Sequence, residues 1–151
     1  MSSIQSLIDD FGPVLASASD SRRKSILQQV TDLFIESADR YSPDQVEIFD
    51  VVLKLLMDKA KPNDLIALSE KLAPIANAPA NVIERLAQDN EATIAGPVLA
   101  KSPALSDATL TNIASNKGAG HLLAIASRAR IDEPMTDLLI DRKSTRLNSS
   151  H

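Results

Sequence analysis

The chain contains no cysteine and no tryptophan, and its aromatic residues are three Phe and one Tyr in 151 residues. Without cysteine it has no disulfide, no thiolate metal ligand and no thiol nucleophile, which fits a reducing compartment. With so few rings, its core must be built from Leu, Ile, Val and Ala. Small aliphatic side chains of this kind suit closely packed helices.

Long hydrophobic runs are also missing from the sequence. No stretch approaches the roughly 20 apolar residues that a bilayer span needs, and the start Met-Ser-Ser-Ile-Gln lacks the basic and apolar regions of an export signal. The formal net charge is -4 and the sequence pI is about 5.1, so the overall field repels a phosphate backbone. We therefore expect a cytoplasmic protein that binds neither membrane nor nucleic acid.

From Pro79 onward, apolar residues recur at a spacing of 27 positions. A single pair of short amphipathic helices cannot enclose its own apolar stripe, so copies of such a pair must stack on one another. The spacing therefore predicts an all-α fold of antiparallel helix pairs stacked as a HEAT-like α-α superhelix. The matched residues are Ile83, Leu86, Ala87, Ala95 and Val98 with Leu110, Ile113, Ala114, Leu122 and Ile125, and Leu86 again with Ile140.

Helical spacing also continues through the first half of the chain. One helix is predicted from about Ser21, a second after the capping box Ser42-Pro43-Asp44-Gln45, and a third after Pro62, ending before Pro74. The repeat then predicts helices over 80–88, 91–101, 106–116, 119–129 and 133–140, with N-caps at Asn90, Ser106 and Asp132. Gly96-Pro97 is expected to kink the second of these five helices.

The chain divides into three parts in this interpretation. Residues 1–20 form a short helix that stops at Gly12-Pro13 and a mobile connection, and residues 21–140 form a single helical-repeat domain. Residues 141–151 resemble the in-frame translation of a sequencing-library adapter, and we expect this segment to be a non-native tail on a truncated domain.

Several segments, in order, match a known bacterial family. They are Thr31-Asp-Leu-Phe34, Gln45-Val46 with Phe49-Asp50, Leu72-Ala-Pro74 with Asn77-Ala-Pro79, Ala95-Gly-Pro-Val-Leu99 with Ser102-Pro103, Lys117-Gly118 with His121-Leu122 and Ala124-Ile125, and Thr136-Asp137. Over residues 30–141 the chain resembles domain of unknown function 2336. The resemblance implies an all-helical, repeat-like architecture that extends further, and it carries no known activity, substrate or site.

His121 is the residue with the most chemical potential, because it could be a phosphoacceptor, a general base or a ligand. Outside segment 141–151 it has no second histidine with which to share a metal. Lys117-Gly-Ala-Gly120 could offer backbone N–H groups to an anion, but the rest of a phosphate-binding loop is absent. We favour a packing role for His121 and a turn at Lys117–Gly120. The functional hypothesis is that Lys117, His121 and Arg128 form a partner-binding surface.

The remaining charged groups point to no reaction. We interpret them as solvated charge, since nothing in the sequence places two of the carboxylates together in a buried pocket. These groups are the basic segment Arg22-Arg-Lys-Ser25 and the carboxylates Asp44, Glu47, Asp50, Asp132, Glu133 and Asp137. We expect no catalytic residues, no metal and no cofactor.

The favoured function is therefore a non-catalytic interaction or scaffold module with a protein partner. The alternatives are a phosphotransfer-type signalling module that uses His121 and a small enzyme whose site is not visible in the sequence. Self-association is expected through an uncapped C-terminal helix that carries Met135, Leu138 and Leu139.

Overall fold

The structure of the protein is a computed structural model that describes residues 9, 12–128 and 139–140. Within these residues the secondary structure is helical and contains no strand, which confirms the predicted all-α fold. The elements are α2 (Asp20–Glu36), the short 3-10 helix η1 (Ala38–Arg40), α3 (Pro43–Met57), α4 (Pro62–Leu72), α5 (Ala80–Ala87), α6 (Ala92–Lys101), α7 (Asp107–Asn116) and α8 (Ala119–Ala126).

Local sequence signals start several of these helices. The capping box before α3 is confirmed, because the Ser42 hydroxyl accepts from the Gln45 N–H at 3.3 Å and the Gln45 side chain accepts from the Ser42 N–H at 2.8 Å. Ser106 caps α7 by accepting from the Thr109 N–H at 3.2 Å, also as predicted. These starts depend only on residues three positions apart, so the sequence alone determines them.

Two predicted boundaries are wrong. Residues 12–17 are helical, so Gly12-Pro13 does not end a helix there; a proline fits the first turn of a helix, where its missing N–H costs nothing. Asn90 is not the N-cap of α6, since that helix starts at Ala92 and the N-cap residue is Glu91. Asp132 and residues 133–138 lie outside the described residues, as do residues 141–151, and residues 139–140 are helical.

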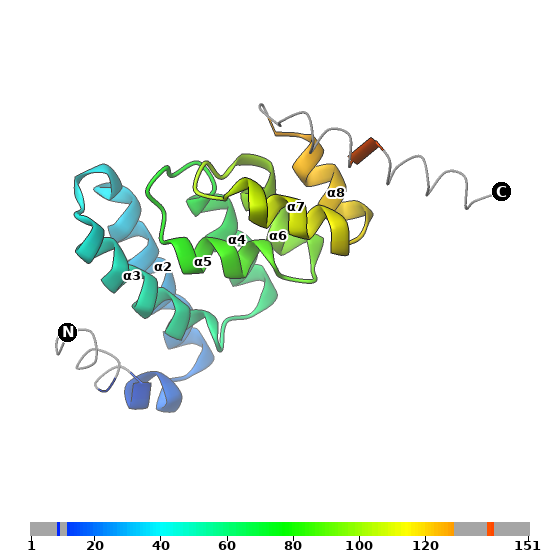
Figure 1. Ribbon diagram of the computed structural model, residues 1–151. Helices are drawn as coiled ribbons and strands as arrows, with labels where there is room; N and C mark the ends of the chain where they lie inside the picture. Colours follow the sequence, from blue (N-terminus) through cyan, green and yellow to red (C-terminus); the bar gives the residue numbers. More distant parts are fainter. Residues whose placement is uncertain (1–8, 10–11, 129–138, 141–151) are drawn as a thin grey trace.

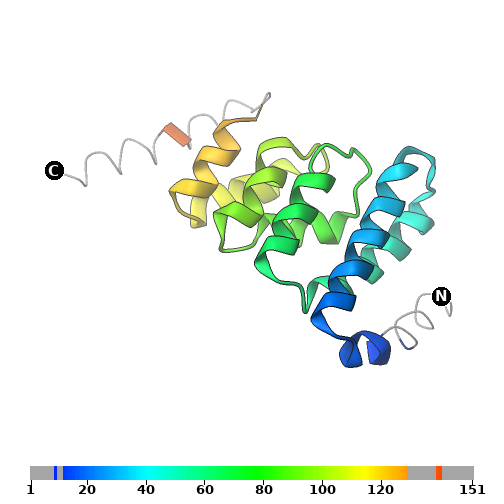
Figure 2. The same cartoon turned by 180° about the vertical axis from the view of Figure 1, so that it is seen from behind.

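Alternate helices lie side by side in the fold. Helices α2, α4, α6 and α8 form one row, each packed against the next, while α3 and α5 pack together on one side of this row and α7 lies against α8 (Figures 1 and 2). The two ends of the row are therefore α2 and α8. None of the helices in the described part of the chain combines the length and the apolar character that a membrane span requires.

The core follows the seam between the two sets of helices. Three of the four aromatic residues, Phe34, Tyr41 and Phe49, form one cluster at the α2–α3 end, with ring centroids 5.0–5.7 Å apart. Beyond this cluster the core is aliphatic, as the composition predicted. Its fully buried members include Leu53, Leu56, Leu72, Ile83, Leu86, Leu99, Ile113 and Ile125.

The matched positions 27 residues apart occupy corresponding places in α5–α6 and α7–α8. All of them are buried except Leu122, which is half-buried, and Ile140, which is 55% exposed and so departs from the prediction. A second correspondence was missed, because Val52, Leu53, Leu56 and Met57 of α3 match Val82, Ile83, Leu86 and Ala87 of α5 at 30 positions, and all eight are buried. The offset is larger because the α4–α5 link, residues 73–79, is longer than the α6–α7 link, residues 102–106, and because α4, with 11 residues, is longer than α6, with 10.

Candidate functional site

The three residues predicted to bind a partner all contact the α5–α6 pair from the α7–α8 pair. Lys117 Nζ donates to the Asn90 side-chain oxygen at 2.5 Å. His121 is only 4% exposed, and its Nε2 lies 2.7 Å from the Asp89 carbonyl oxygen. Because a carbonyl oxygen only accepts, Nε2 carries the proton and donates it in this contact.

Arg128 reaches the other end of α6. Its Nη1 donates to the Leu99 carbonyl and its Nη2 to the Ser102 carbonyl, both at 2.6 Å. These carbonyls lie at the C-terminal end of α6, Leu99 in its last turn and Ser102 as its C-cap residue, where a cation interacts favourably with the helix dipole. Burial lowers the pKa of Arg128 and the negative charge of Asp107 offsets part of that effect, but a guanidinium remains charged throughout the ordinary pH range.

These contacts tie one helix pair to the next rather than line an open groove. His121 occupies the position 27 residues after the buried Ile94, so the repeat itself indicated that this side chain would be buried. A phosphoacceptor would need an exposed ring with a free nitrogen, and the buried ring with its bonded Nε2 does not provide that. The partner-binding role of Lys117, His121 and Arg128 stays a prediction.

Gly120 explains how closely α8 approaches α6. A Cβ atom added at Gly120 would lie 2.6 Å from the Ala92 Cβ, which is too close for two carbon atoms that are not bonded to each other. Gly118 is the N-cap residue of α8. Lys117 and Gly118 thus form the predicted turn before α8, whereas Ala119 and Gly120 are already the first two residues of that helix. The absence of a side chain at Gly120 lets α6 and α8 touch.

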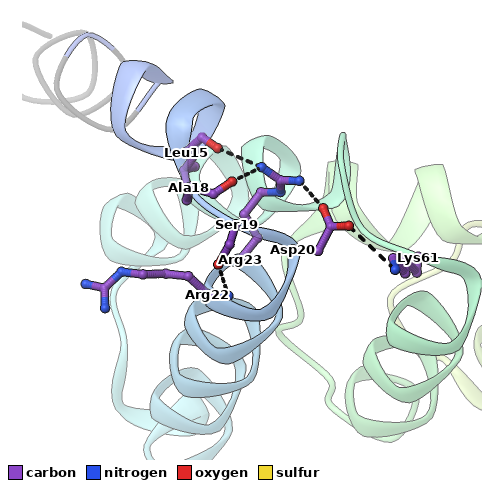
Figure 3. A network of polar contacts seen from close by, with 7 residues as sticks. All are labelled: Leu15, Ala18, Ser19, Asp20, Arg22, Arg23 and Lys61. Atoms are coloured by element: carbon purple, nitrogen blue, oxygen red, sulfur yellow. Dashed lines mark hydrogen bonds and ion pairs between the residues drawn. The ribbon is translucent and has the colours of Figure 1, made fainter.

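The polar network at the start of α2 is shown in Figure 3. The Arg23 guanidinium donates to the carbonyls of Leu15 and Ala18 and pairs with Asp20, which also lies 3.5 Å from Lys61 Nζ. The Arg23 side chain is only 15% exposed, so the prediction that Arg22-Arg-Lys-Ser25 is solvated throughout is wrong at this position. Its guanidinium holds residues 15–18 against α2.

Two hollows lie beside the contact of α2 with α4, of about 260 and 240 Å³ with the solvent at their mouths included, and the second is also lined by Leu56 of α3 and by residues 59–61. Ion pairs cross this seam, from Lys24 to Asp64 at 3.8 Å and from Lys71 to Asp32 at 2.9 Å. The lining carboxylates thus face lysines rather than each other, and acid–base chemistry would need two converging groups. No group of three or more metal-ligating side chains occurs among the described residues.

Asp50 is a carboxylate whose place the sequence did not predict. It was expected to be solvated, but it is 6% exposed and accepts from the Val82 N–H at 2.9 Å and from the Asn81 amide at 2.8 Å. Both donors lie in the first turn of α5, which has no side-chain cap from its own N-cap residue, Pro79. Asp50 therefore caps α5 from a neighbouring helix, which is a structural role.

One surface of the α-helical row is free of charged side chains. We define the α6–α8 face as Thr93, Gly96, Pro97 and Ala100 of α6 with Gly120, Leu123, Ala124 and Ser127 at the positions 27 residues later. All eight residues are exposed or half-buried, Leu123 is 71% exposed, and nothing lies within 4 Å of a Cβ built at Gly96. On α4, the preceding helix of the row, the position 30 residues before Ala100 is the charged Glu70. The uncharged surface therefore begins at α6.

Comparison with known proteins gives one match. Residues 94–148 match the family described as "Uncharacterised protein conserved in bacteria (DUF2336)". No curated protein and no solved structure matches the chain. The matched range reaches residue 148 and so includes most of segment 141–151, whose adapter origin stays a prediction.

The match agrees with the family that the sequence motifs indicated. In the described residues it covers most of α6, all of α7 and all of α8, the helices that carry the α6–α8 face. Through residues 94–148, this chain is therefore similar to the uncharacterised bacterial proteins of the DUF2336 family.

Proposed function

We propose that the chain is a non-catalytic, HEAT-like helical-repeat module of the cytoplasm that binds a protein partner and acts as a scaffold. The observation that carries the proposal is the α6–α8 face. Exposed helix surfaces are ordinarily rich in charged residues, and a contiguous uncharged surface with an exposed large apolar side chain is typical of an interaction site. The row of packed helices supplies the rigid support that such a surface needs.

The chemistry of this face suits a protein partner. Thr93, Gly96 and Ala100 carry no charge that would have to lose its water on binding. Pro97 has no N–H, so the Thr93 carbonyl lacks its usual helical donor and offers an acceptor on the same face. Leu123 adds an apolar side chain that a partner can bury.

The alternatives have less support. A phosphotransfer role for His121 requires an accessible ring, whereas this ring is 4% exposed and bonded to a carbonyl of the α5–α6 link. An enzyme would need polar groups that converge on a substrate, and the carboxylates beside the α2–α4 hollows are paired with lysines. His121 and the carboxylates beside the hollows therefore both make contacts that hold neighbouring parts of the fold together.

The test compares partner capture by the wild-type chain and two variants. Immobilised chain is exposed to lysate of the source bacterium, captured proteins are identified, and binding is repeated with the purified partner. Thr93→Glu combined with Ala100→Glu should weaken binding about tenfold or more, since it places two charges in a desolvated contact. Asn63→Glu is the matched control, because Asn63 of α4 is the exposed equivalent of Thr93 at 30 positions.

The control should bind like the wild type, and circular dichroism should show all three chains equally helical. Equal capture by the double variant and the wild type would overturn the proposal for this face.

A further inference from the structure

We propose that two copies of the chain associate through α8, each docking the same surface against the other. The surface consists of Ala119, Leu122, Leu123 and Ala126, and we call it the terminal face of α8. The inference goes beyond the proposed function, because it concerns self-association at the end of the helix row rather than partner binding along its side. The two surfaces share Leu123, but Thr93 and Ala100 belong only to the α6–α8 face. An association in which both copies use the same surface is the commonest arrangement of dimers.

The terminal face repeats a surface that already binds a helix within the chain. Its residues lie 27 positions after Ala92, Ala95, Gly96 and Leu99 of α6. On that side of α6, Ala92 meets Gly120 of α8, and the Leu99 carbonyl accepts from Arg128. The terminal face thus continues the α2–α4–α6–α8 series of helix interfaces by one step.

Two of the four positions of this surface are more open on α8 than on α6, whereas Ala92 and Ala119 are both half-buried and Gly96, the equivalent of Leu123, is half-buried with free space around it. Ala95 and Leu99 are fully buried, whereas the equivalent Leu122 is half-buried and Ala126 is exposed. Leu123, at 71%, is more exposed than the other large apolar side chains found exposed among the described residues, Val14, Leu33 and Ile140. Figures 1 and 2 show α8 at the end of the row, with α6 on one side of it only.

Electrostatics favours α8 as the meeting point of two copies. Each copy carries a formal net charge of -4, so the copies repel one another at long range. Helix α8 contains no Asp, Glu, Lys or Arg, and two α8 helices can meet without burying a charge. The opposite end of the row, α2, exposes Arg22, Asp32 and Glu36 and lacks this property.

Residues 146–150 do not supply the apolar side chains that the 27-residue repeat would place against the terminal face. At the next step of 27 positions, Ala119, Leu122 and Leu123 correspond to Arg146, Ser149 and Ser150. These polar residues do not repeat the apolar pattern of the terminal face. A second α8 does, because it carries the same four side chains.

The absence of cysteine gives a direct test with the 151-residue chain. Under mild oxidation, Ala126→Cys should form a covalent dimer, since the cysteine lies in the self-complementary contact. Leu33→Cys is the control, because Leu33 is 55% exposed on α2 at the other end of the row. In sedimentation velocity, the wild type should show a concentration-dependent dimer, and Leu123→Lys should weaken it about tenfold or more, while Leu33→Lys should not.

The inference is overturned if the wild type stays monomeric at every soluble concentration, or if Ala126→Cys forms no more covalent dimer than Leu33→Cys. Loss of helicity in Leu123→Lys would leave the cysteine comparison to decide. The result is separable from the proposed function, because Thr93→Glu with Ala100→Glu should weaken partner capture about tenfold or more and keep the dimer. A monomer that still captures its partner would contradict only the self-association.

Discussion

Gly96 and Gly120 both lie within helices, but their surroundings differ. Nothing lies within 4 Å of a Cβ built at Gly96, whereas a Cβ at Gly120 would meet Ala92 at 2.6 Å. We therefore predict that Gly96→Ala raises the free energy of unfolding by about 0.5–1 kcal/mol, since alanine loses less backbone entropy in a helix. Gly120→Ala should lower it by about 1–3 kcal/mol, because α8 must move away from α6.

Urea unfolding followed by circular dichroism measures both changes. If Gly120→Ala were as stable as Gly96→Ala, the close contact of α6 with α8 would not limit stability, and our account of Gly120 would be wrong.

At this scale the sequence predicts the contacts whose partners are close along the chain. The caps at Ser42 and Ser106 depend on residues three positions later and were predicted correctly. Asn90 was predicted as a cap, but its side-chain oxygen accepts from Lys117, 27 positions away. Arg128 bonds to backbone carbonyls, and no pattern of side chains reveals such a partner.

Among the elements, α5 depends on its neighbour for its N-terminal cap. Asp50→Ala should leave the buried Val82 N–H without its acceptor and lower the free energy of unfolding by about 1–3 kcal/mol. Glu47→Ala, on an exposed position of the same helix, is the control and should change it by less than about 0.5 kcal/mol. Denaturant titration of the three proteins makes the comparison.

Equal stability of the Asp50 and Glu47 variants would mean that another acceptor or water replaces the carboxylate. In that case the cap would not contribute to stability.

The bounds of the elements were predicted well where apolar spacing and a breaker agree. The predicted 80–88, 91–101 and 106–116 correspond to Ala80–Ala87, Ala92–Lys101 and Asp107–Asn116. The predicted 119–129 corresponds to α8, which ends at Ala126. The match of α3 to α5 was not predicted, because the longer α4–α5 link and the longer α4 place it at 30 positions, away from the 27-residue spacing of the later helices.

For the molecule as a whole, the row arrangement determines how far a local change spreads. Each helix of the row contacts its neighbours, so a perturbation at α8 reaches α2 through α6 and then through either α4 or the pair α5 and α3. We predict that Gly120→Ala lowers amide hydrogen-exchange protection most in α7 and α8 and least in α2 and α3. Exchange measured by mass spectrometry on peptides from each helix resolves this gradient.

A uniform loss of protection across all helices would instead indicate one cooperative unit. That outcome would contradict the stepwise coupling expected of a helical repeat.

The matching positions of α5–α6 and α7–α8 also bear on how such a chain can change over evolutionary time. A duplicated gene segment encoding one 27-residue unit would present to each neighbour the same side chains that the neighbour already accommodates. Inserting such a unit lengthens the protein without redesigning the interior on either side of the insertion. Molecular length is thus a heritable trait that can vary in whole increments among descendants of one ancestral gene.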